Sequence, residues 1–398
     1  MKDDGERMKI VMIAPTPFFA DRGCHTRIYG EIRGLQAMGH RVILVTYGLG
    51  RDMPGAETVR CFNFPWYRKL SAGPSVWKIL LLPVIAHKAR KTIRREKPDV
   101  VHAHLHEGAV AARWCRIFCR KPLYIFDCQG SLSGELAGHK AIGEKGLVFR
   151  TVRAVEKRID RFFPVLTQSE ELTAQLVSFG VPRERIRNVM DAADTDLYRP
   201  AEPDPVLAEK LGIDLAKPRA LYMGLLSEYQ GTSLMLRAFA RAAEKVKDAQ
   251  FIIIGYPNEE KYRQEAAELG LLDRTVFVGK LPYEETAEYL RLSEVAAAPK
   301  ISLSEGDGKL YNYMATGMAA VCFERSISRE ILGDAGLYAP MGDAAKFGEQ
   351  LARLMLDPQE RKALGEKARK RAEGFSIYEN AKKIDAFYKE LMHAEEAH

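Results

Sequence analysis

Short apolar segments alternate with longer amphipathic segments from the start of the chain. Gly39 closes a helical stretch that runs from about His25 to Met38. Such stretches separate the strand candidates IVMIAP (10–15), RVILVTYG (41–48), DVVHAH (99–104), PLYIFD (122–127) and FFPVLTQS (162–169). The alternation predicts a doubly wound α/β lobe with a parallel sheet.

A second series of the same kind follows the linker RPAEPDP (199–205). Residues 375–398 carry apolar side chains at helical spacing, so we expect a final amphipathic helix there. Two Rossmann-like lobes would place two sets of strand carboxyl ends at a central cleft, where open parallel sheets bind ligands. The strand candidates of the second series are ALYMG (220–224), FIIIG (251–255), VFVGKL (276–281), VAAAP (295–299) and AAVCFE (319–324).

Composition limits the class of protein without changing this outline. A chain of 398 residues with 46% hydrophobic and 28% charged residues suits two globular domains. Its six cysteines follow neither a disulfide nor a zinc spacing, so we expect reduced, buried thiols, with Cys115 and Cys119 at apolar helix positions. The N-terminus lacks the apolar core of a signal peptide, and no run is long enough to span a membrane. We therefore expect a cytoplasmic protein.

The formal charge of +7 favours an anionic partner. Between Trp66 and Lys97 there are nine Lys or Arg against one acid, interleaved with aromatic and aliphatic residues. We expect residues 66–97 to make peripheral contact with an anionic membrane, on the inner face of the cell membrane. The alternative is an ordinary domain helix with a solvated basic face, since Pro74 and Pro83 would interrupt an amphipathic helix. No recognition motif for nucleic acid accompanies the charge, so we expect none as a partner.

Four stretches in chain order resemble the retaining glycosyltransferases of family four, the glycosyl transferases group 1. They are MGHRVILVT (38–46), KPDVVHAH (97–104), NVMDAADTDLYRP (188–200) and EGDGKLYNYMATGMAAVCFE (305–324). The resemblance spans nearly the whole chain and implies the GT-B fold, with an acceptor-binding lobe followed by a nucleotide-sugar-binding lobe. The last helix would cross back to the first lobe. The expected domains are 1–198, 199–374 and 375–398.

The resemblance also implies that the configuration of the donor sugar is retained without an essential metal or other cofactor. Asp194 and Asp196 match a metal-binding DxD only superficially, and we interpret them as part of a hinge turn. His102, His104 and His106 alternate as if along one strand face, but no second ligand cluster accompanies them in the sequence. We therefore predict no metal site.

A glycine-rich segment before a predicted helix has the chemistry of a diphosphate site. Departure of a nucleoside diphosphate leaves negative charge that the protein must stabilise. Glycine frees backbone N–H groups to approach phosphate, and a helix from about Lys309 to Ala315 would point its N-terminus at it. Lys309 would add a mobile cation. The predicted binding residues here are Gly306, Asp307, Gly308, Lys309 and Leu310.

The sequence departs from the family at several donor-binding positions. The resemblance assigns sugar and ribose contacts to two glutamates, and Ser304 and Asn312 stand in their places. A shift of one residue would give the sugar contact to Glu305, while Asn312 could still bind a ribose hydroxyl. After Gly224, another predicted binding residue, Leu225 and Gln230 replace the family's phosphate-binding Arg and Lys.

Losing those two cations weakens donor binding unless other groups compensate for them. Compensation would come from Lys309, Arg22 and backbone amides. Arg22 and Gly23 lie in a loop expected to face the donor phosphates, where Gly23 permits close backbone approach. The same glycine could equally form a tight turn with no ligand.

The acceptor lobe lacks the catalytic histidine that family members often place after the strand at 122–127. Asp127 ends this strand, and we expect it to orient or deprotonate an acceptor hydroxyl through a raised pKa. Capping of the following turn is an equal alternative for Asp127. Gln129 and Gly130, in the same turn, are predicted to bind substrate.

We therefore predict a retaining glycosyltransferase with Asp127 and Glu305 as its catalytic residues. It would move a hexose from a nucleotide diphosphate sugar, expected to be a UDP- or GDP-sugar, to a hydroxyl of a lipid-linked or cell-envelope glycan. One alternative is a GT-B-like subunit that has lost turnover and supports a partner transferase. The residues that favour it are Leu225, Gln230, Ser304 and Asn312. A sugar-nucleotide epimerase is a third option, which the hinge and loop motifs fit less well.

Overall fold

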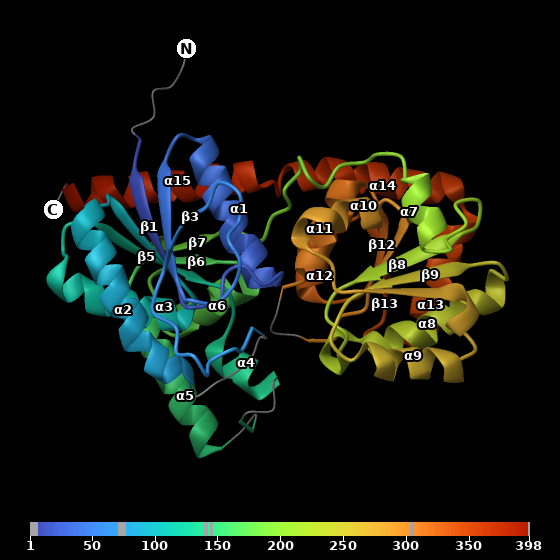
Figure 1. Ribbon diagram of the computed structural model, residues 1–398, viewed down its shortest axis with the longest axis horizontal. Helices are drawn as coiled ribbons and strands as arrows, with labels where there is room; N and C mark the ends of the chain where they lie inside the picture. Colours follow the sequence, from blue (N-terminus) through green and yellow to red (C-terminus); the bar gives the residue numbers. More distant parts are fainter. Residues whose placement is uncertain (1–6, 71–76, 139–141, 144–145, 303–305, 397–398) are drawn as a thin grey trace, which may run out of the picture. The chain divides into compact units, whose positions relative to one another are not determined.

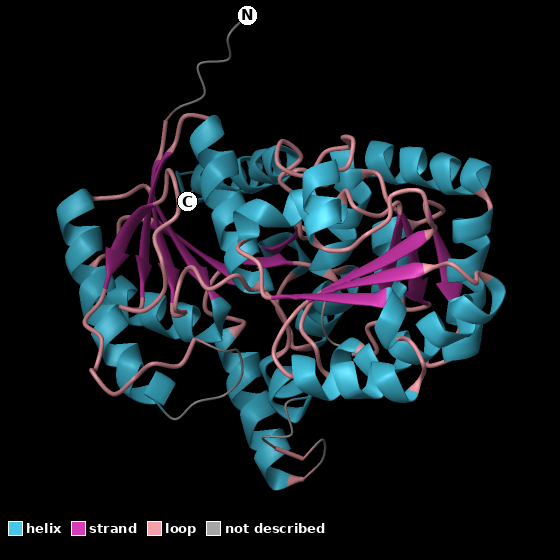
Figure 2. Cartoon of the chain, turned by 45° about the vertical axis from the view of Figure 1, so that its right-hand side comes forward, coloured by secondary structure: helices cyan, strands magenta, loops and turns pink. Residues whose placement is uncertain are grey.

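The computed structural model describes residues 7–70, 77–138, 142–143, 146–302 and 306–396, and the chain divides into two compact units (Figure 1). Unit 1 comprises Met1–Asp191 and Ile377–His398, and unit 2 comprises Ala192–Ser376. Each unit holds one sheet with helices on both faces (Figure 2). The predicted doubly wound α/β architecture is therefore confirmed for each unit.

Unit 2 begins a few residues before the predicted boundary at 198. Ala193 pairs with Ser376, and its N–H donates to the carbonyl of Phe375, so the two ends of unit 2 lie together. Tyr198 is buried in the same unit, where its hydroxyl lies 2.7 Å from Thr286 Oγ1. These contacts attach the hinge residues to the second unit, although their polar composition is typical of a linker.

The sheet of unit 1 has seven parallel strands in the order β3-β2-β1-β4-β5-β6-β7. The order reverses between β1 and β4, which lie next to each other at the centre. The strands are β1 (Lys9–Ala14), β2 (Arg41–Thr46), β3 (Glu57–Arg60), β4 (Val100–His104), β5 (Leu123–Cys128), β6 (Val165–Thr167) and β7 (Ile186–Asn188).

Helices cover both faces of this sheet. The C-terminal helix α15 packs along α1, where Cβ atoms added to Gly30 and Gly34 would collide with α15 residues. Helices α2 and α3 lie on the other face (Figure 1). The helices are α1 (Gly23–Ala37), α2 (Trp77–Glu96), α3 (Leu105–Phe118), α4 (Leu132–Gly138), α5 (Leu147–Ile159), α6 (Glu170–Ser178), a 3-10 turn at Arg183–Arg185, and α15 (Ile377–Glu396).

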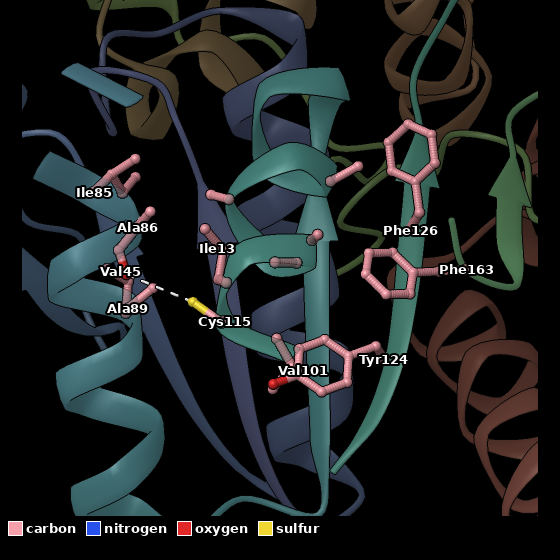
Figure 3. Close-up of a cluster of buried hydrophobic side chains, with 14 of the residues drawn as sticks. Ile13, Val45, Ile85, Ala86, Ala89, Val101, Cys115, Tyr124, Phe126 and Phe163 are labelled. Atoms are coloured by element: carbon pink, nitrogen blue, oxygen red, sulfur yellow. Dashed lines mark hydrogen bonds between the residues drawn. The ribbon is translucent and has the colours of Figure 1, made fainter. Parts of the chain in front are cut away.

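The core of unit 1 fills the space between the sheet and helices α2 and α3. Strand residues such as Val45 and Val101 interleave there with Ile85 and Ala89 of α2 (Figure 3). The Cys115 thiol donates to the carbonyl of Ala86 at 3.5 Å and ties the two helices together. Burial of this apolar surface is the main force that holds the helices to the sheet.

Unit 2 repeats the topology, with six parallel strands in the order β10-β9-β8-β11-β12-β13. Helices α8 and α13 cover one face and α11 and α14 the other (Figure 1). The strands are β8 (Arg219–Met223), β9 (Gln250–Ile254), β10 (Thr275–Gly279), β11 (Val295–Ala298), β12 (Ala319–Phe323) and β13 (Gly336–Ala339). The helices are α7 (Pro205–Lys210), α8 (Thr232–Lys245), α9 (Glu259–Glu268), α10 (Thr286–Leu290), α11 (Gly308–Thr316), α12 (Ser326–Leu332), α13 (Ala344–Leu356) and α14 (Pro358–Glu373), with 3-10 turns at Glu228–Gln230, Leu272–Arg274 and Tyr283–Glu285.

Each predicted strand is present, but the sequence pattern missed β3, β7 and β13. All three are short strands at the edges of their sheets. Polar side chains interrupt β3 and β7, whereas the apolar run of β13 is only four residues long. The prediction that Pro83 interrupts its helix is wrong, because α2 continues through it. Cys119 lies one residue beyond α3 rather than within it, and Pro74 lies outside the described residues. The six cysteines are free thiols, four of them buried.

Among the described residues, no helix combines the length and the apolar character needed to cross a bilayer.

Candidate functional site

Charged side chains gather in unit 2 where the strand order reverses between β8 and β11. Loops diverge at such a reversal, and the carboxyl ends of the strands there are the usual ligand site of a parallel sheet. Lys300 follows β11, Arg325 follows β12, and Asp307 immediately precedes α11. Lys309 is the second residue of α11. Four charged residues, from two loops and the first turn of α11, therefore meet at one edge of the sheet.

Asp307 lies at the centre of this group, with its side chain 1% exposed. Its Oδ1 lies 3.1 Å from Lys309 Nζ, and its Oδ2 lies 3.1 Å from a terminal nitrogen of Arg325. Lys300 Nζ donates to the carbonyl of Gly306 at 2.7 Å. Burial raises the pKa of Asp307, but the charges of Lys309, Arg325 and Lys300 outweigh it and lower that pKa. Three cations thus surround a single ionised carboxylate.

Lys309 is held in place by several contacts. Its Nζ donates to Gln230 Oε1 at 2.9 Å as well as to Asp307, and it lies 5.4 Å from the centre of the Tyr222 ring. A Cβ at Gly224 would lie 3.0 Å from Lys309 Cε, so a glycine is needed for this approach. Burial lowers the pKa of Lys309, against the opposing charge of Asp307. The prediction of a mobile cation is therefore wrong, because the side chain is 8% exposed and fixed.

The other predicted donor residues have less distinctive positions. Gly308 begins α11, and the carbonyl of Gly306 accepts from Lys300. Leu310 is part of the core, and its N–H donates to the carbonyl of Asp307. Asn312 is half-buried on α11. Ser304 and Glu305, and with them the predicted sugar contact, lie outside the described residues.

Sequence reasoning missed Lys300 and Arg325. Both directly follow strands that the pattern did predict, at 295–299 and 319–324. The rule that ligands bind at the carboxyl ends of parallel strands would have found them. Leu225 and Gln230, which replace the phosphate-binding cations of the family, both lie near Lys309 and Tyr222. Gln230 supports Lys309, and the Leu225 carbonyl accepts from the Tyr222 hydroxyl.

Unit 1 contains a buried charge cluster between α1 and the carboxyl ends of β4 and β5. Arg27 donates to both oxygens of Asp127, at 3.1 and 2.7 Å, and lies 3.1 Å from Glu31 Oε1. It also donates to Asp191 Oδ1 at 2.9 Å. We call these four residues, with His102 and His104, the Arg27 cluster. A planar guanidinium suits such bidentate pairing with a carboxylate.

The structure contradicts the expectation that Asp127 is a base with a raised pKa. Its side chain is wholly buried, and burial alone would raise its pKa. The charge and hydrogen bonds of Arg27, together with a hydrogen bond from His104, overcome this and hold the pKa far below its usual range. The carboxylate also accepts from Gln129 Nε2 at 2.7 Å, and its hydrogen-bond partners among the described residues are side chains rather than the backbone N–H groups that a turn cap would use. Asp127 is an acceptor in a polar core.

The three histidines do not share one face. His102 and His104 stack with ring centroids 4.4 Å apart, His104 Nδ1 lies 3.0 Å from Asp127 Oδ2, and His102 Nδ1 lies 2.6 Å from the Tyr388 hydroxyl of α15. His106 is the second residue of α3 instead, and it contacts Asp160. The predicted alternation fails because β4 ends at His104.

Two groups of buried side chains have metal-binding chemistry, against the prediction that the sequence holds no ligand cluster. Glu31, His102, His104 and Asp127 form one group, and His106, Cys128 and Asp160 form the other. In the first group the guanidinium of Arg27 already pairs with both carboxylates. A cation in the first group would therefore lie beside a fixed positive charge.

The remaining predicted residues of unit 1 lie at the loop before α1 and at the turn after β5. Arg22 donates to Thr16 Oγ1 at 2.7 Å, and Gly23 is the exposed first residue of α1, where an added Cβ would meet only open space. The carbonyl of Gln129 accepts from Gln168 and precedes Gly130. Asp194 Oδ1 accepts from the N–H groups of Asp196 and Leu197, which confirms the interpretation of this stretch as a turn.

Comparison with known proteins agrees with this architecture. The model of the family described as "Glycosyl transferases group 1" matches residues 204–371, and that of the "Glycosyl transferase 4-like domain" matches residues 22–190. The D-inositol 3-phosphate glycosyltransferase of Corynebacterium efficiens is 27% identical over 57% of this chain and 56% of its own length. The chain thus spans little more than half the length of the first curated relatives that it matches.

A phosphatidyl-myo-inositol mannosyltransferase from Mycobacterium leprae is 29% identical over 87% of both chains. Among solved structures, the sucrose-phosphate synthase of Thermosynechococcus elongatus superposes with a TM-score of 0.81 at 19% identity, covering 98% of this chain and 100% of the other. The Anabaena protein HepE in complex with UDP-glucose gives 0.75 at 16% identity, with 98% and 100% covered. With two family models that together match most of both units, the chain belongs to the group 1 glycosyltransferases of family four and has the GT-B fold.

Proposed function

We propose that the chain is a retaining glycosyltransferase that transfers a hexose from a nucleotide diphosphate sugar to a hydroxyl of a lipid-linked or cell-envelope glycan. The observation that carries this proposal is the group of Lys300, Lys309 and Arg325 around Asp307. Three cations against one carboxylate leave an excess of positive charge at the strand ends. A diphosphate, which gains charge as the sugar departs, is the ligand that this excess favours.

These cations answer the main argument for a subunit without turnover. Leu225 and Gln230 stand at positions where family members carry phosphate-binding cations. Lys300 and Arg325 supply two positive charges at the same edge of the sheet, and Gln230 orients a third on Lys309. Their fixed positions lower the cost of reorganisation as charge develops on the leaving group. The enzyme is therefore the favoured alternative.

In the proposed reaction the bond between the sugar C1 and the diphosphate oxygen breaks while the acceptor oxygen attacks the same face of the sugar. The acceptor proton passes to the departing phosphate, so the step needs no metal and no basic side chain. Lys300, Lys309 and Arg325 would stabilise the charge of the diphosphate. Asn312 would bind a ribose hydroxyl, and Glu305 would contact the sugar. Asp127, with its low pKa, would act as a positioning residue that holds Gln129 through its 2.7 Å hydrogen bond.

A UDP-sugar is the first donor to test, with a GDP-sugar second. HepE, which shares the fold, was solved with UDP-glucose. The Mycobacterium leprae relative is named for a phosphatidyl-myo-inositol acceptor, which supports a lipid-linked acceptor for this chain.

The surface of unit 1 supports contact with an anionic membrane. Phe64 stacks on Trp66, and Trp66 packs against Trp77 at the start of α2, with ring centroids 5.2 and 6.3 Å apart. Trp66 is 63% exposed and Ile79 72% exposed. Exposed aromatic and aliphatic side chains beside basic residues are typical of a protein that lies on a lipid surface.

Only the start of α2 is available for this contact. Leu81, Ile85, Ala89 and Ile93 are buried in the core, so the rest of the helix is an ordinary domain helix. We therefore propose membrane contact for the start of α2 alone, and interpret the buried remainder as a domain helix. Helix α5 adds a second exposed apolar and basic face, with Leu147 and Val148 exposed beside Arg150.

Calorimetric titration with UDP-glucose and GDP-mannose tests the donor site. Arg325→Met and Lys300→Met should each weaken binding of the preferred donor by about 10- to 100-fold, since a charge-assisted hydrogen bond contributes about 1.5–3 kcal/mol. Lys261→Met removes an exposed lysine of the same unit and serves as the matched control. Equal affinity in all three variants would contradict the assignment. Binding without turnover in an acceptor screen would favour the partner-dependent subunit instead.

Sedimentation with vesicles tests the membrane contact separately. Ile79→Asp should abolish binding to phosphatidylglycerol vesicles and leave donor binding unchanged, because Ile79 lies on the surface of unit 1. Val206→Asp, which changes an exposed apolar residue of unit 2, is the control. Similar loss in both variants would argue against a dedicated surface on α2.

A further inference from the structure

We propose that His106, Cys128 and Asp160 form a binding site for a single Zn²⁺ ion in unit 1. The three side chains come from three different elements: His106 from the first turn of α3, Cys128 from the end of β5, and Asp160 from the residue that follows α5. One ligand atom from each lies within 4.8 Å of the other two. All three residues are buried.

The hydrogen bonding of this group is incomplete. His106 Nε2 lies 3.2 Å from Asp160 Oδ1. Among the described residues, however, neither this nitrogen nor either carboxylate oxygen of Asp160 has a partner in hydrogen-bond geometry. Buried carboxylates normally have their oxygens satisfied, because an unpaired buried charge is costly. Among the described residues, the wholly buried carboxylate of Asp160 is therefore compensated only by its 3.2 Å contact with His106, and a bound cation would add to that compensation.

The neighbouring carboxylate of Glu156 shows the contrast. It is also wholly buried, but it accepts from the hydroxyls of Ser131 and Ser133 and from the N–H groups of Leu132 and Ser133. Among the described residues, no Lys or Arg is among the main electrostatic influences on His106, Cys128 or Asp160. Among these three residues the His106 imidazole is the only basic group, and it is itself a candidate ligand.

The combination of metal-ligand atoms in this group favours zinc. One imidazole nitrogen, one thiol sulfur and one carboxylate oxygen are all common Zn²⁺ ligands, whereas Mg²⁺ and Ca²⁺ prefer sites made only of oxygen. A tetrahedral zinc site with bonds of about 2.0–2.3 Å places its ligand atoms about 3.5 Å apart, so side-chain shifts of about 1 Å would complete it. The carbonyl oxygen of Gly130, 3.4 Å from Cys128 Sγ, is placed to supply a fourth ligand.

The Arg27 cluster is the less suitable of the two groups for a cation. Its carboxylates already pair with a buried guanidinium, whereas His106, Cys128 and Asp160 have no such partner among the described residues. A zinc ion at His106 would join α3, β5 and the end of α5, and it would fix the turn that carries Gln129 and Gly130. We expect a structural role, since burial leaves little room for a reacting ligand.

Cobalt substitution of the full-length protein tests the site without reference to transferase activity. The protein is treated with chelator under reducing conditions and titrated with Co²⁺, and the thiolate-to-cobalt charge-transfer absorption in the near ultraviolet is recorded. We expect one equivalent to bind, with that absorption present, and Zn²⁺ to displace it. Metal analysis of protein grown in zinc-supplemented medium should give the same stoichiometry, and chelation should lower the Tm.

Variants identify the ligands. Cys128→Ser should remove the charge-transfer absorption, and Asp160→Asn, which keeps the side-chain volume, should weaken Zn²⁺ binding at least tenfold. Cys119→Ser changes a half-buried thiol outside the group and should behave as the unmodified protein. Absence of metal uptake by folded protein would overturn the proposal. Uptake that persists in Cys128→Ser, or that Glu31→Gln abolishes, would place the ion elsewhere and would overturn it as well.

Discussion

Replacing Arg27 with methionine tests whether the buried charge cluster stabilises unit 1. The substitution keeps the length of the apolar stem but leaves Asp127 wholly buried with only His104 and Gln129 as partners among the described residues. Removing one partner of a buried ion pair costs about 3–5 kcal/mol. In a unit of this size 1 kcal/mol corresponds to about 2–4 °C, so the Tm of unit 1 should fall by about 6–20 °C.

Asp127→Asn should destabilise unit 1 less than Arg27→Met. Burial raises the pKa of Glu31 well above its usual range, and the charge of Asp127 raises it further. Without that charge Glu31 can ionise and become the partner of Arg27, whose guanidinium lies 3.1 Å away. We expect a loss of about 1–3 kcal/mol.

The pH dependence gives an independent check. When the pKa of a carboxyl group is higher in the folded than in the unfolded protein, the folded protein loses stability as pH rises from the lower pKa toward the higher one. Glu31 should therefore make unit 1 progressively less stable as pH rises above its unfolded pKa of about 4.3 in the unmodified protein. Asp127→Asn should reduce that slope. The depressed pKa of Asp127 acts in the opposite sense, since its contribution is complete above its unfolded pKa and is lost only in strong acid.

Scanning calorimetry of the full chain measures these effects. Tryptophan fluorescence recorded in parallel assigns the transition, because Trp66, Trp77 and Trp114 all lie in unit 1. Arg41→Met is the matched control, since it removes an arginine from an exposed ion pair with Glu57 and should change the Tm very little. The reasoning is refuted if Arg27→Met and Arg41→Met have the same Tm, or if Asp127→Asn is the more damaging substitution.

Three further substitutions probe the donor site and the packing of each unit. Because burial lowers the pKa of Lys309, the affinity for the sugar donor should fall with rising pH before ordinary lysines titrate. Lys309→Arg should flatten this pH dependence, measured by calorimetry, since arginine stays charged. An unchanged pH dependence would argue against Lys309 at the diphosphate. In Gly34→Leu the added Cβ would lie 2.4 Å from the Ile377 carbonyl, so α15 should become sensitive to limited proteolysis. Gly23→Leu is the control, since a Cβ at this first residue of the same helix would meet open space. Equal protection of α15 in both variants would contradict this packing. Gly231 has a φ of +77°, and a Cβ there would lie 1.9 Å from the Pro299 carbonyl oxygen. Gly231→Ala should therefore lower the Tm of unit 2 by several degrees in calorimetry. An unchanged Tm would show that the loop after β11 can shift at little energetic cost.

The apolar pattern determined the architecture because parallel strands buried on both faces have continuous runs of aliphatic residues. It therefore located β1, β8 and their neighbours, and it missed short edge strands such as β3. The resemblance in 305–324 directed attention to Asp307 and Lys309, which the structure brings together. Backbone propensity and local motifs are properties of neighbouring residues, so a single sequence carries them.

Only the tertiary structure decided the charge state and the partners of the polar side chains. Asp127 differs from its prediction because Arg27, 100 positions earlier on α1, pairs with it across the sheet. Arg325 meets Asp307 in the same way, from a separate loop. Coulomb energy and desolvation depend on distance in space and on burial, neither of which the spacing of residues along a chain fixes. The sequence therefore determined where the strands end, and the packing of helices and loops around those ends decided what the charged groups there can do.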